Sequence, residues 1–206
     1  MIIHCFQRIK KIFKILSLRS QLMIMESRKI KNSELGRLNV NEFKTANKSP
    51  IYIILDNIRS LNNIGSVFRS ADAFRVEKIF LCGITATPPH KDIHKTALGA
   101  TESIEWEYAE HTIDVLNKLQ KENVLCYALE QAANSISLEN FEFPLNQKVA
   151  IILGNEVEGV QQDIVSASDY TLEIPQYGTK HSFNVSVSNG ICLWEVFQKW
   201  KGTLNR

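Results

Sequence analysis

Short, strongly apolar runs alternate with stretches of helical periodicity along most of the chain. Such runs occur at residues 51–55, 76–83, 123–130, 149–154 and 170–175. A strand that is buried on both faces is apolar throughout, and strands of this kind form parallel sheets. The spacing of amphipathic helices is found between the runs, at residues 63–74, 112–122, 160–168 and 184–200. We therefore predict an α/β fold, with a mostly parallel sheet covered by helices on both faces.

Two segments carry predictions of their own. Residues 84–100 include a Pro-Pro pair and are predicted to form a long polar connection. On the last helix, apolar residues at helical spacing predict a buried face, made of Val187, Ile191, Trp194, Val196 and Phe197.

The charge is unevenly distributed, although the net charge is only +2. Residues 1–31 hold eight Lys or Arg and one acid, whereas residues 32–206 hold sixteen Lys or Arg and twenty-one acids. We expect residues 1–49 to be a basic extension, partly disordered or helical, and residues 50–206 to be the folded domain. The extension is too interrupted by charge to span a membrane, and it lacks the pattern of a signal peptide.

Three interpretations of this basic segment stay open. It is an amphipathic helix that touches RNA or a membrane surface, a disordered tail, or translated upstream sequence. In the last case the true start is Met23 or Met25, and residues 1–24 are not native.

The cysteines and histidines show no metal or redox pattern. The cysteines are scattered and form no C-x-x-C pair: Cys5, Cys82, Cys126 and Cys192. We expect a reducing, cytoplasmic compartment, in which the last three are small buried apolar residues. His90 and His94 are four residues apart, but no further ligand keeps regular spacing with them, so no metal site is expected.

Polar, glycine- or proline-bounded stretches follow three of the predicted strands, at residues 56–65, 154–159 and 175–184. In open α/β sheets, ligands bind beyond the carboxyl ends of the strands. No P-loop, no G-x-G-x-x-G after a strand and no G-x-S-x-G elbow is present in the sequence. A P-loop nucleotide site and an ordinary dinucleotide or Rossmann-type methyltransferase site are therefore not expected. Asn155 and Glu156 follow Gly154, with no lysine beside them.

These three stretches resemble the motifs of one known family in order and spacing. "NNIGSVFRSADAF", "ILGNEVEGV" and "LEIPQYGTKHSFNVSVSNG" are similar to the three motifs of the SpoU (TrmH-type) RNA 2′-O-ribose methyltransferases of the SPOUT superfamily. "HKTALGA" resembles a lesser motif between the first and the second. The resemblance covers about residues 50–200. It implies a C-terminal deep trefoil knot (SPOUT fold), S-adenosyl-L-methionine as the cofactor, and a homodimer built through the C-terminal helix.

The resemblance also implies roles for individual residues. The cofactor-facing positions are Leu129, Gly154, Ile174, Pro175, Ser182 and Phe183. The catalytic positions are Asn63, Arg69, Glu156, Ser182 and Asn184. The arginine acts as general base or positions a phosphate, and we favour positioning because a guanidinium stays protonated. Glu156 is expected to hold either the arginine or a backbone donor of a loop. Asn63 and Asn184 are also candidate N-caps of the helices that follow them.

Basic residues near the motifs are candidates for RNA contact, namely Arg59, Arg75, Lys91, Lys95 and Lys180. Scattered surface charge is the alternative for the lysines. Four positions depart from the family pattern: Arg75 stands where glycine is common, Phe183 where leucine is usual, and Ser188 and Asn189 where small apolar residues are usual.

The function predicted from these observations is transfer of a methyl group from S-adenosylmethionine to a ribose 2′-hydroxyl of RNA. Residues 1–49 are too short and too polar for a separate RNA-binding domain. The resemblance implies that members without such a domain mostly modify tRNA, so we favour tRNA over rRNA. The alternatives are an rRNA 2′-O-methyltransferase, a noncatalytic knot-containing RNA-binding protein, and a nucleotide-binding enzyme of unrelated type. No membrane association is expected.

Overall fold

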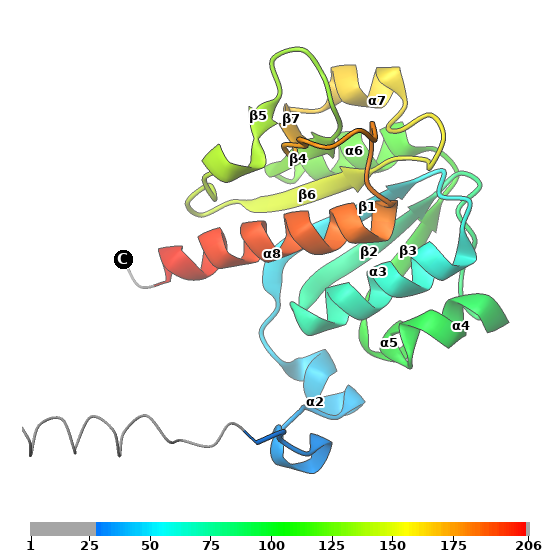
Figure 1. Cartoon of the computed structure of the whole chain (residues 1–206), viewed down its shortest axis with the longest axis vertical. Helices are drawn as coiled ribbons and strands as arrows, with labels where there is room; N and C mark the ends of the chain where they lie inside the picture. The colour runs from blue at the N-terminus through cyan, green and yellow to red at the C-terminus, as the bar shows by residue number, and fades with distance from the viewer. Residues whose placement is uncertain (1–27, 205–206) are drawn as a thin grey trace, which may run out of the picture. The chain divides into compact units, whose positions relative to one another are not determined.

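Seven strands of the described chain lie in one sheet, in the order β3-β2-β1-β6-β4-β7-β5 (Figure 1). Their bounds are β1 (Ser49–Asp56), β2 (Val76–Cys82), β3 (Glu105–Ala109), β4 (Val124–Leu129), β5 (Ile136–Ser137), β6 (Lys148–Leu153) and β7 (Tyr170–Glu173). Every neighbouring pair is parallel. Ile53 of the central strand β1 lies opposite Ile79 on one side and Ile151 on the other. The predicted parallel sheet is confirmed.

The computed structural model describes residues 28–204. Residues from Leu38 onward form one compact unit, and all strands belong to it. Residues 28–37 belong to a separate unit, in which Arg28 pairs with Glu34 of the short helix η1 (Asn32–Glu34) at 2.7 Å. The interpretations of residues 1–24 lie outside the described residues.

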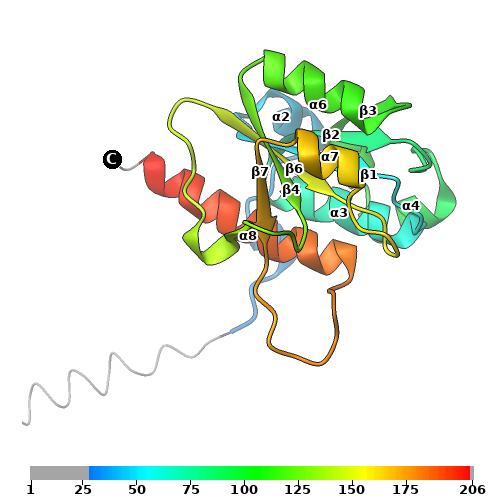
Figure 2. The same cartoon turned by 90° about the horizontal axis from the view of Figure 1, so that it is seen from above.

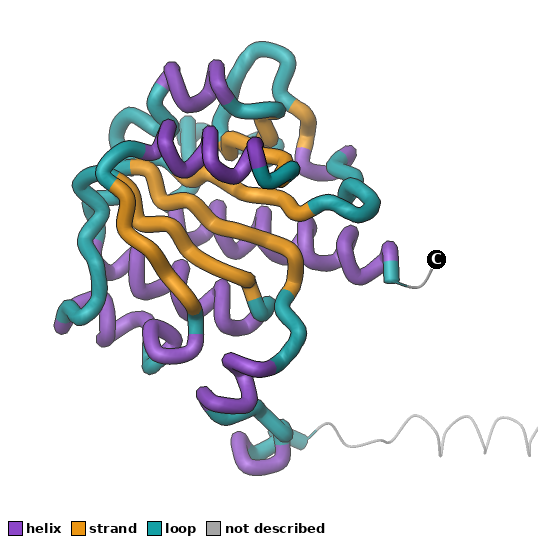
Figure 3. Tube along the Cα trace, turned by 180° about the vertical axis from the view of Figure 1, so that it is seen from behind, coloured by secondary structure: helices purple, strands orange, loops and turns teal. Residues whose placement is uncertain are grey.

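Helices cover both faces of the sheet. Within the larger unit they are α2 (Val40–Thr45), α3 (Leu61–Ala73), α4 (Lys91–Ala97), α5 (Ala100–Ser103), α6 (Thr112–Lys121), η2 (Leu138–Asn140), α7 (Gln162–Ala167) and α8 (Val185–Thr203). Figure 2 shows α6 and α7 on one face and α3 and α8 on the other. Figure 3, the view from the opposite side, also shows helices on both sides of the strands.

Alternate residues of β1 enter two separate apolar cores, as the period of a strand requires. Ile51, Ile53 and Leu55 belong to the core under α3 and α8, whereas Tyr52 and Ile54 belong to the core under α6 and α7. The expectation that the strands are buried on both faces is therefore confirmed at the centre of the sheet. The three cysteines expected to be buried, at positions 82, 126 and 192, are free and buried.

The predicted polar connection at residues 84–100 is wrong in its second half, which holds α4. His90 caps this helix, because its Nδ1 accepts from the backbone N–H of Asp92 at 3.2 Å. Ile93 and Ala97 are buried against α3, where Gly65 leaves room for the α4 backbone. The helix is too short for its periodicity to stand out in the sequence. The edge strand β3 was not predicted either, because two of its five residues are glutamates and none of the five is fully buried.

The predicted buried face of the last helix is wrong at three of its five positions. Val187, Ile191 and Trp194 are 48%, 38% and 55% exposed. The buried side of α8 is instead made of Val185, Asn189, Cys192, Leu193 and Val196. Helix α8 is apolar on two sides, so its spacing alone could not show which side meets the sheet. The predicted trefoil knot in the C-terminal third stays a prediction.

Candidate functional site

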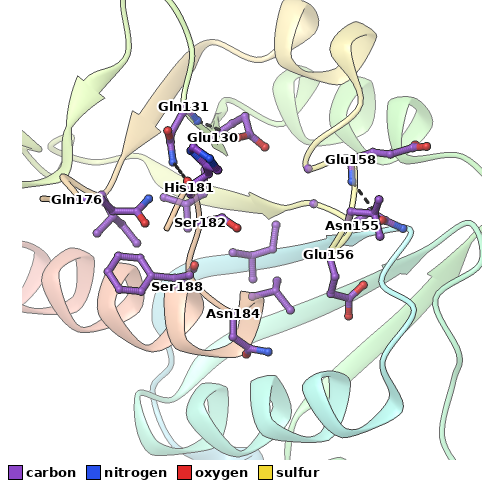
Figure 4. A pocket seen from close by; sticks show the side chains of 18 residues that line it. Glu130, Gln131, Asn155, Glu156, Glu158, Gln176, His181, Ser182, Asn184 and Ser188 are labelled. Atoms are coloured by element: carbon purple, nitrogen blue, oxygen red, sulfur yellow. Dashed lines mark hydrogen bonds between the residues drawn. The ribbon is translucent and has the colours of Figure 1, made fainter. Parts of the chain in front are cut away.

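A cavity of about 560 Å³ opens beyond the carboxyl ends of β4, β6 and β7. Three loops meet there, and Figure 4 shows their side chains converging on one space. The lining residues are Leu129 to Gln131 after β4, Leu153 to Gly159 around the loop after β6, and Ile174, Gln176, His181 to Val185 and Ser188 around the loop after β7. Strands of a parallel sheet end at one edge, so loops that are distant in the sequence share this site.

The loop after β6 is folded tightly back on itself. Asn155 and Gly159 exchange two backbone hydrogen bonds of 2.9 Å. A Cβ atom at Gly154 would overlap the backbone of Gly159 and Val160, so only glycine fits there. Gly159 has a φ of 73°, in the left-handed region that favours glycine. The two glycines therefore allow the turn that holds Glu156 at the cavity.

Glu156 ties this loop to the start of α3. Its carboxylate accepts hydrogen bonds from the backbone N–H groups of Arg59 and Ser60 and from Nδ2 of Asn63, each at 3.0 Å. Partial burial raises the pKa of Glu156, but these hydrogen bonds to the charged form outweigh burial, and the pKa lies below its ordinary value. Of the two alternatives expected for this residue, it holds the backbone donors of a loop.

Asn63 connects the three motifs. Its Nδ2 donates to Glu156, and its Oδ1 accepts from Nδ2 of Asn184 at 3.2 Å. Asn184 is also the N-cap of α8, because its Oδ1 accepts from the backbone N–H of Ser186 at 3.0 Å. The expected capping role of Asn184 is therefore confirmed. The cap of α3 is Ser60, and the alternative that Asn63 is the N-cap is wrong.

Arg69 lies on α3, six residues after Asn63, and its side chain is exposed. It is not among the residues that line the cavity. The structure therefore leaves Arg69 open to solvent and outside the lining of the pocket.

Most of the expected cofactor positions meet in the cavity. Those that line it are Leu129, Gly154, Ile174, Ser182 and Phe183. Pro175 is not among the lining residues, although Ile174 and Gln176 on either side of it are. Phe183 is 42% exposed, at the rim. Two departures from the family pattern also lie near: Ser188 lines the cavity, and Asn189 is buried with its Nδ2 unpartnered.

The cavity is acidic. Glu130, Glu156 and Glu158 line it, and none of the described lining residues is Lys or Arg. His181 is the only basic residue among these lining residues. Because like charges repel and opposite charges attract, this lining favours a cationic ligand over a phosphate.

The candidate RNA contacts lie at different places. Arg59 is exposed in the loop between β1 and α3 and lines a second cavity of about 360 Å³ beside Asn155. Lys91 and Lys95 are exposed on α4, and Lys180 is exposed in the loop after β7. Arg75 is exposed as well, but it precedes β2, at the sheet edge opposite the cavity. Its φ of 51° lies in the left-handed region that favours glycine.

Several lining residues were missed from the sequence, above all Glu130, Gln131 and Gln176. Glu130 is the last residue of the strand predicted at residues 123–130, so its place at the carboxyl edge of the sheet was the available signal. Among the described residues no group of His, Cys, Asp and Glu could hold a metal ion. None of the helices in residues 28–204 is long and apolar enough to cross a membrane.

Known proteins are similar to this chain in sequence and in fold. The 23S rRNA (guanosine-2′-O-)-methyltransferase RlmB of Vibrio vulnificus (strain CMCP6) is 25% identical over 166 residues, which are 81% of this chain and 66% of that protein. The crystal structure of the A. aeolicus TrmH/SpoU tRNA modifying enzyme superposes with a TM-score of 0.71 at 21% identity, covering 80% of this chain and 82% of that one. An AdoMet-bound rRNA methyltransferase from Sinorhizobium meliloti gives a TM-score of 0.68 at 26% identity, covering 74% and 57%.

A model of one protein family, described as the SpoU rRNA Methylase family, matches residues 50–194. This match spans all three motifs, including the segments that carry Asn63, Glu156 and Asn184. It confirms the resemblance that the motifs carried, and the chain belongs to the SpoU rRNA methylase family.

Proposed function

We propose that this protein transfers a methyl group from S-adenosylmethionine to a ribose 2′-hydroxyl of RNA. The observation that carries the proposal is the hydrogen-bonded series from Asn184 through Asn63 to Glu156, whose two ends, Asn184 and Glu156, line the cavity. The series joins all three family motifs, so the segments expected to hold the cofactor and the target ribose form one structural unit. Relatives named as 2′-O-methyltransferases and an AdoMet-bound relative support it.

The cavity fits the proposed cofactor. Leu129, Ile174 and Phe183 supply apolar walls for an adenine ring, and Gly154 lines the cavity with backbone alone. The acidic lining matches a cofactor that carries a sulfonium and an ammonium group. S-adenosylmethionine, when bound, supplies a methyl group that is already activated for transfer.

The protein's own residues then hold the RNA in place. Glu156 fixes the backbone at Arg59 and Ser60, and thereby the loop that leads into α3. Arg69 on that helix offers an exposed guanidinium, which binds a phosphate beside the target ribose and favours release of the 2′-hydroxyl proton to solvent. Ser182 and Asn184 line the same rim and orient the ribose. Catalysis rests on proximity and charge placement.

A second copy of the chain is part of the proposal. The face of α8 formed by Val187, Ile191 and Trp194 is exposed and apolar, and an unpaired apolar face of this kind is typical of an interface between subunits. It adjoins the cavity, because Phe183 and Ser188 line the pocket at the start of the same helix. We therefore propose a homodimer through α8, with part of the cavity rim at the interface.

The most specific part of the proposal is the class of RNA that is methylated. We place tRNA first, as the sequence led us to expect. We place rRNA second, because RlmB of Vibrio vulnificus is named as a 23S rRNA methyltransferase. Lys91, Lys95, Lys180 and Arg59 are the proposed phosphate contacts. A reducing, cytoplasmic setting fits the free, buried cysteines of the described chain.

The test is transfer of tritium from labelled S-adenosylmethionine to separate pools of unmodified tRNA and rRNA. We expect label in one pool, and its loss when Arg69→Ala replaces the wild type. A protein that binds S-adenosylmethionine but labels neither pool would instead support the noncatalytic RNA-binding alternative. Binding of NAD or ATP in place of S-adenosylmethionine, measured by calorimetry, would support an unrelated nucleotide-binding enzyme.

A further inference from the structure

Two consecutive residues after β4 bind two different loops of the cavity. Oε2 of Glu130 accepts from the backbone N–H of Val160 at 3.0 Å, in the loop after β6. Nε2 of Gln131 donates to the backbone carbonyl of His181 at 2.6 Å, in the loop after β7. Figure 4 shows Glu130, Gln131 and His181 gathered at one end of the pocket. One short segment thus joins the two other loops that form the cavity.

Glu130 also forms hydrogen bonds with the backbone on either side of it. Its Oε1 accepts from the N–H of Gln131 at 2.9 Å, and its own N–H donates to the carbonyl of Leu172 at 2.9 Å. A Cβ atom on Gly159 would overlap Oε2 of Glu130, so the glycine makes room for this carboxylate. Val160 is buried, and without Glu130 its N–H would lose this partner in a place poor in water.

We propose that Glu130 and Gln131 form a clip that positions both walls of the cofactor cavity and thereby sets the affinity for S-adenosylmethionine. The proposal rests on the proposed function, since it takes the cavity as the cofactor site. Both are positioning residues, because each acts through a loop backbone. The loop after β7 needs such a tie: residues 177–184 are exposed and belong to no helix or strand. A loop that is held in place before binding loses less entropy when the ligand arrives.

The two arms predict separate effects on binding. Glu130→Ala removes a charged acceptor and leaves a buried N–H unpaired, so we expect the Kd for S-adenosylmethionine to rise by about tenfold. Gln131→Ala removes one hydrogen bond to an exposed loop, and a rise of about threefold is expected. Because Oε1 of Glu130 also accepts from the N–H of Gln131, the two arms are coupled, and the double variant should depart from the product of the two factors.

The experiment is calorimetry of S-adenosylmethionine and its demethylated product with each variant of the full chain. Glu139→Ala and Gln162→Ala are matched controls, since both are exposed residues outside the cavity lining. Glu130→Gln is the conservative variant: its single acceptor oxygen can serve Val160 but leaves the N–H of Gln131 facing an amide, so an intermediate affinity is expected.

A steady-state readout separates positioning from a purely structural role. We expect KM for S-adenosylmethionine to rise while kcat at saturating cofactor stays near that of the wild type, with an unchanged thermal unfolding midpoint for Gln131→Ala. Equal affinities of variants and wild type would overturn the clip and leave the proposed function standing. A parallel loss of folding and kcat in all variants would also overturn it, as a structural effect. Failure of the wild type to bind S-adenosylmethionine would overturn the proposed function itself.

Discussion

Nδ2 of Asn184 donates a hydrogen bond to Oδ1 of Asn63 at 3.2 Å, across 121 residues of sequence. Asn63 passes the connection on to Glu156, which in turn holds the backbone at Arg59 and Ser60. Each of these polar groups is therefore positioned by another motif and not by its own element alone. A change at one of them should disturb the others, and this is the basis of the first predictions.

Glu156→Gln should lower methyl transfer by about tenfold to a hundredfold, because charge-assisted hydrogen bonds are among the stronger ones. A glutamine has one acceptor oxygen for three donors, and its amide group would face the N–H of Arg59 or Ser60. The measurement is kcat/KM for RNA. Glu142→Gln is the matched control, an exposed glutamate outside the cavity lining. Equal rates for both variants would show that Glu156 does not organise the site.

The pH dependence of stability should carry the signature of the same carboxylate. The pKa of Glu156 is lowered in the folded state, so its contribution is present above its unfolded pKa and is lost as the pH falls through the folded pKa. The difference in melting temperature between wild type and Glu156→Gln should therefore be constant above about pH 5 and shrink in more acidic buffer. A difference that grows on acidification would contradict the assigned direction.

Arg69→Ala should reduce kcat by about a hundredfold while the affinity for S-adenosylmethionine stays within about twofold, since removing one group that stabilises charge costs about this much. The affinity is preserved because Arg69 does not line the cavity. Arg69→Lys should recover part of the rate, because lysine keeps the positive charge but lacks the planar, bidentate donors of the guanidinium. Lys121→Ala, an exposed cation on α6, is the control. A large loss of cofactor affinity in Arg69→Ala would place the residue in the pocket.

Trp194→Asp should convert a dimer into a monomer in sedimentation equilibrium. The side chain is 55% exposed on α8, beside Val187 and Ile191, so a charge there would be buried unpaired in the interface. Leu145→Asp, at a residue that is 66% exposed in a loop, should leave the association unchanged. A monomeric wild type, or a dimer that survives Trp194→Asp, would rule out this face as the interface.

Gly65→Ala should lower the free energy of unfolding by about 1–3 kcal/mol, the usual cost of overpacking. A Cβ atom there would overlap Oγ1 of Thr96 and the carbonyl oxygen of Ile93, where α4 lies against α3. Gly202→Ala, on α8 with nothing within 4 Å of the new atom, should instead stabilise by about 0.5–1 kcal/mol. Urea unfolding of both variants gives the two free energies of unfolding. Equal changes in the two variants would contradict the close packing of α4 against α3 at Gly65.

The sequence predicted best what depends on local pattern. Residues 51–55 and 149–154 are apolar throughout, and they became the central strands β1 and β6. The bounds of α8 were close to the prediction, but its buried side was not, because apolar residues occupy both sides of the helix. Helix α4 was missed because its burial depends on Gly65, a residue far away in the sequence.

In the site, too, the residues of local motifs were predicted, whereas the contacts between distant segments were not. Asn63, Glu156 and Asn184 were expected from their motifs, yet their mutual hydrogen bonds join segments about a hundred residues apart and appear only in the folded chain. Glu130 and Gln131 were missed because their partners, Val160 and His181, belong to other loops. A side chain whose role is to hold another backbone leaves little trace in its own neighbourhood of the sequence.

The most direct test of the central claim is the position of the transferred methyl group. RNA labelled by the wild-type protein with S-adenosylmethionine would be hydrolysed in alkali and the products separated by mass. Transfer to a ribose 2′-oxygen predicts a methylated dinucleotide, because alkaline cleavage needs a free 2′-hydroxyl at that nucleotide. Recovery of all the label in single nucleotides would place the methyl group on a base and contradict the proposed function.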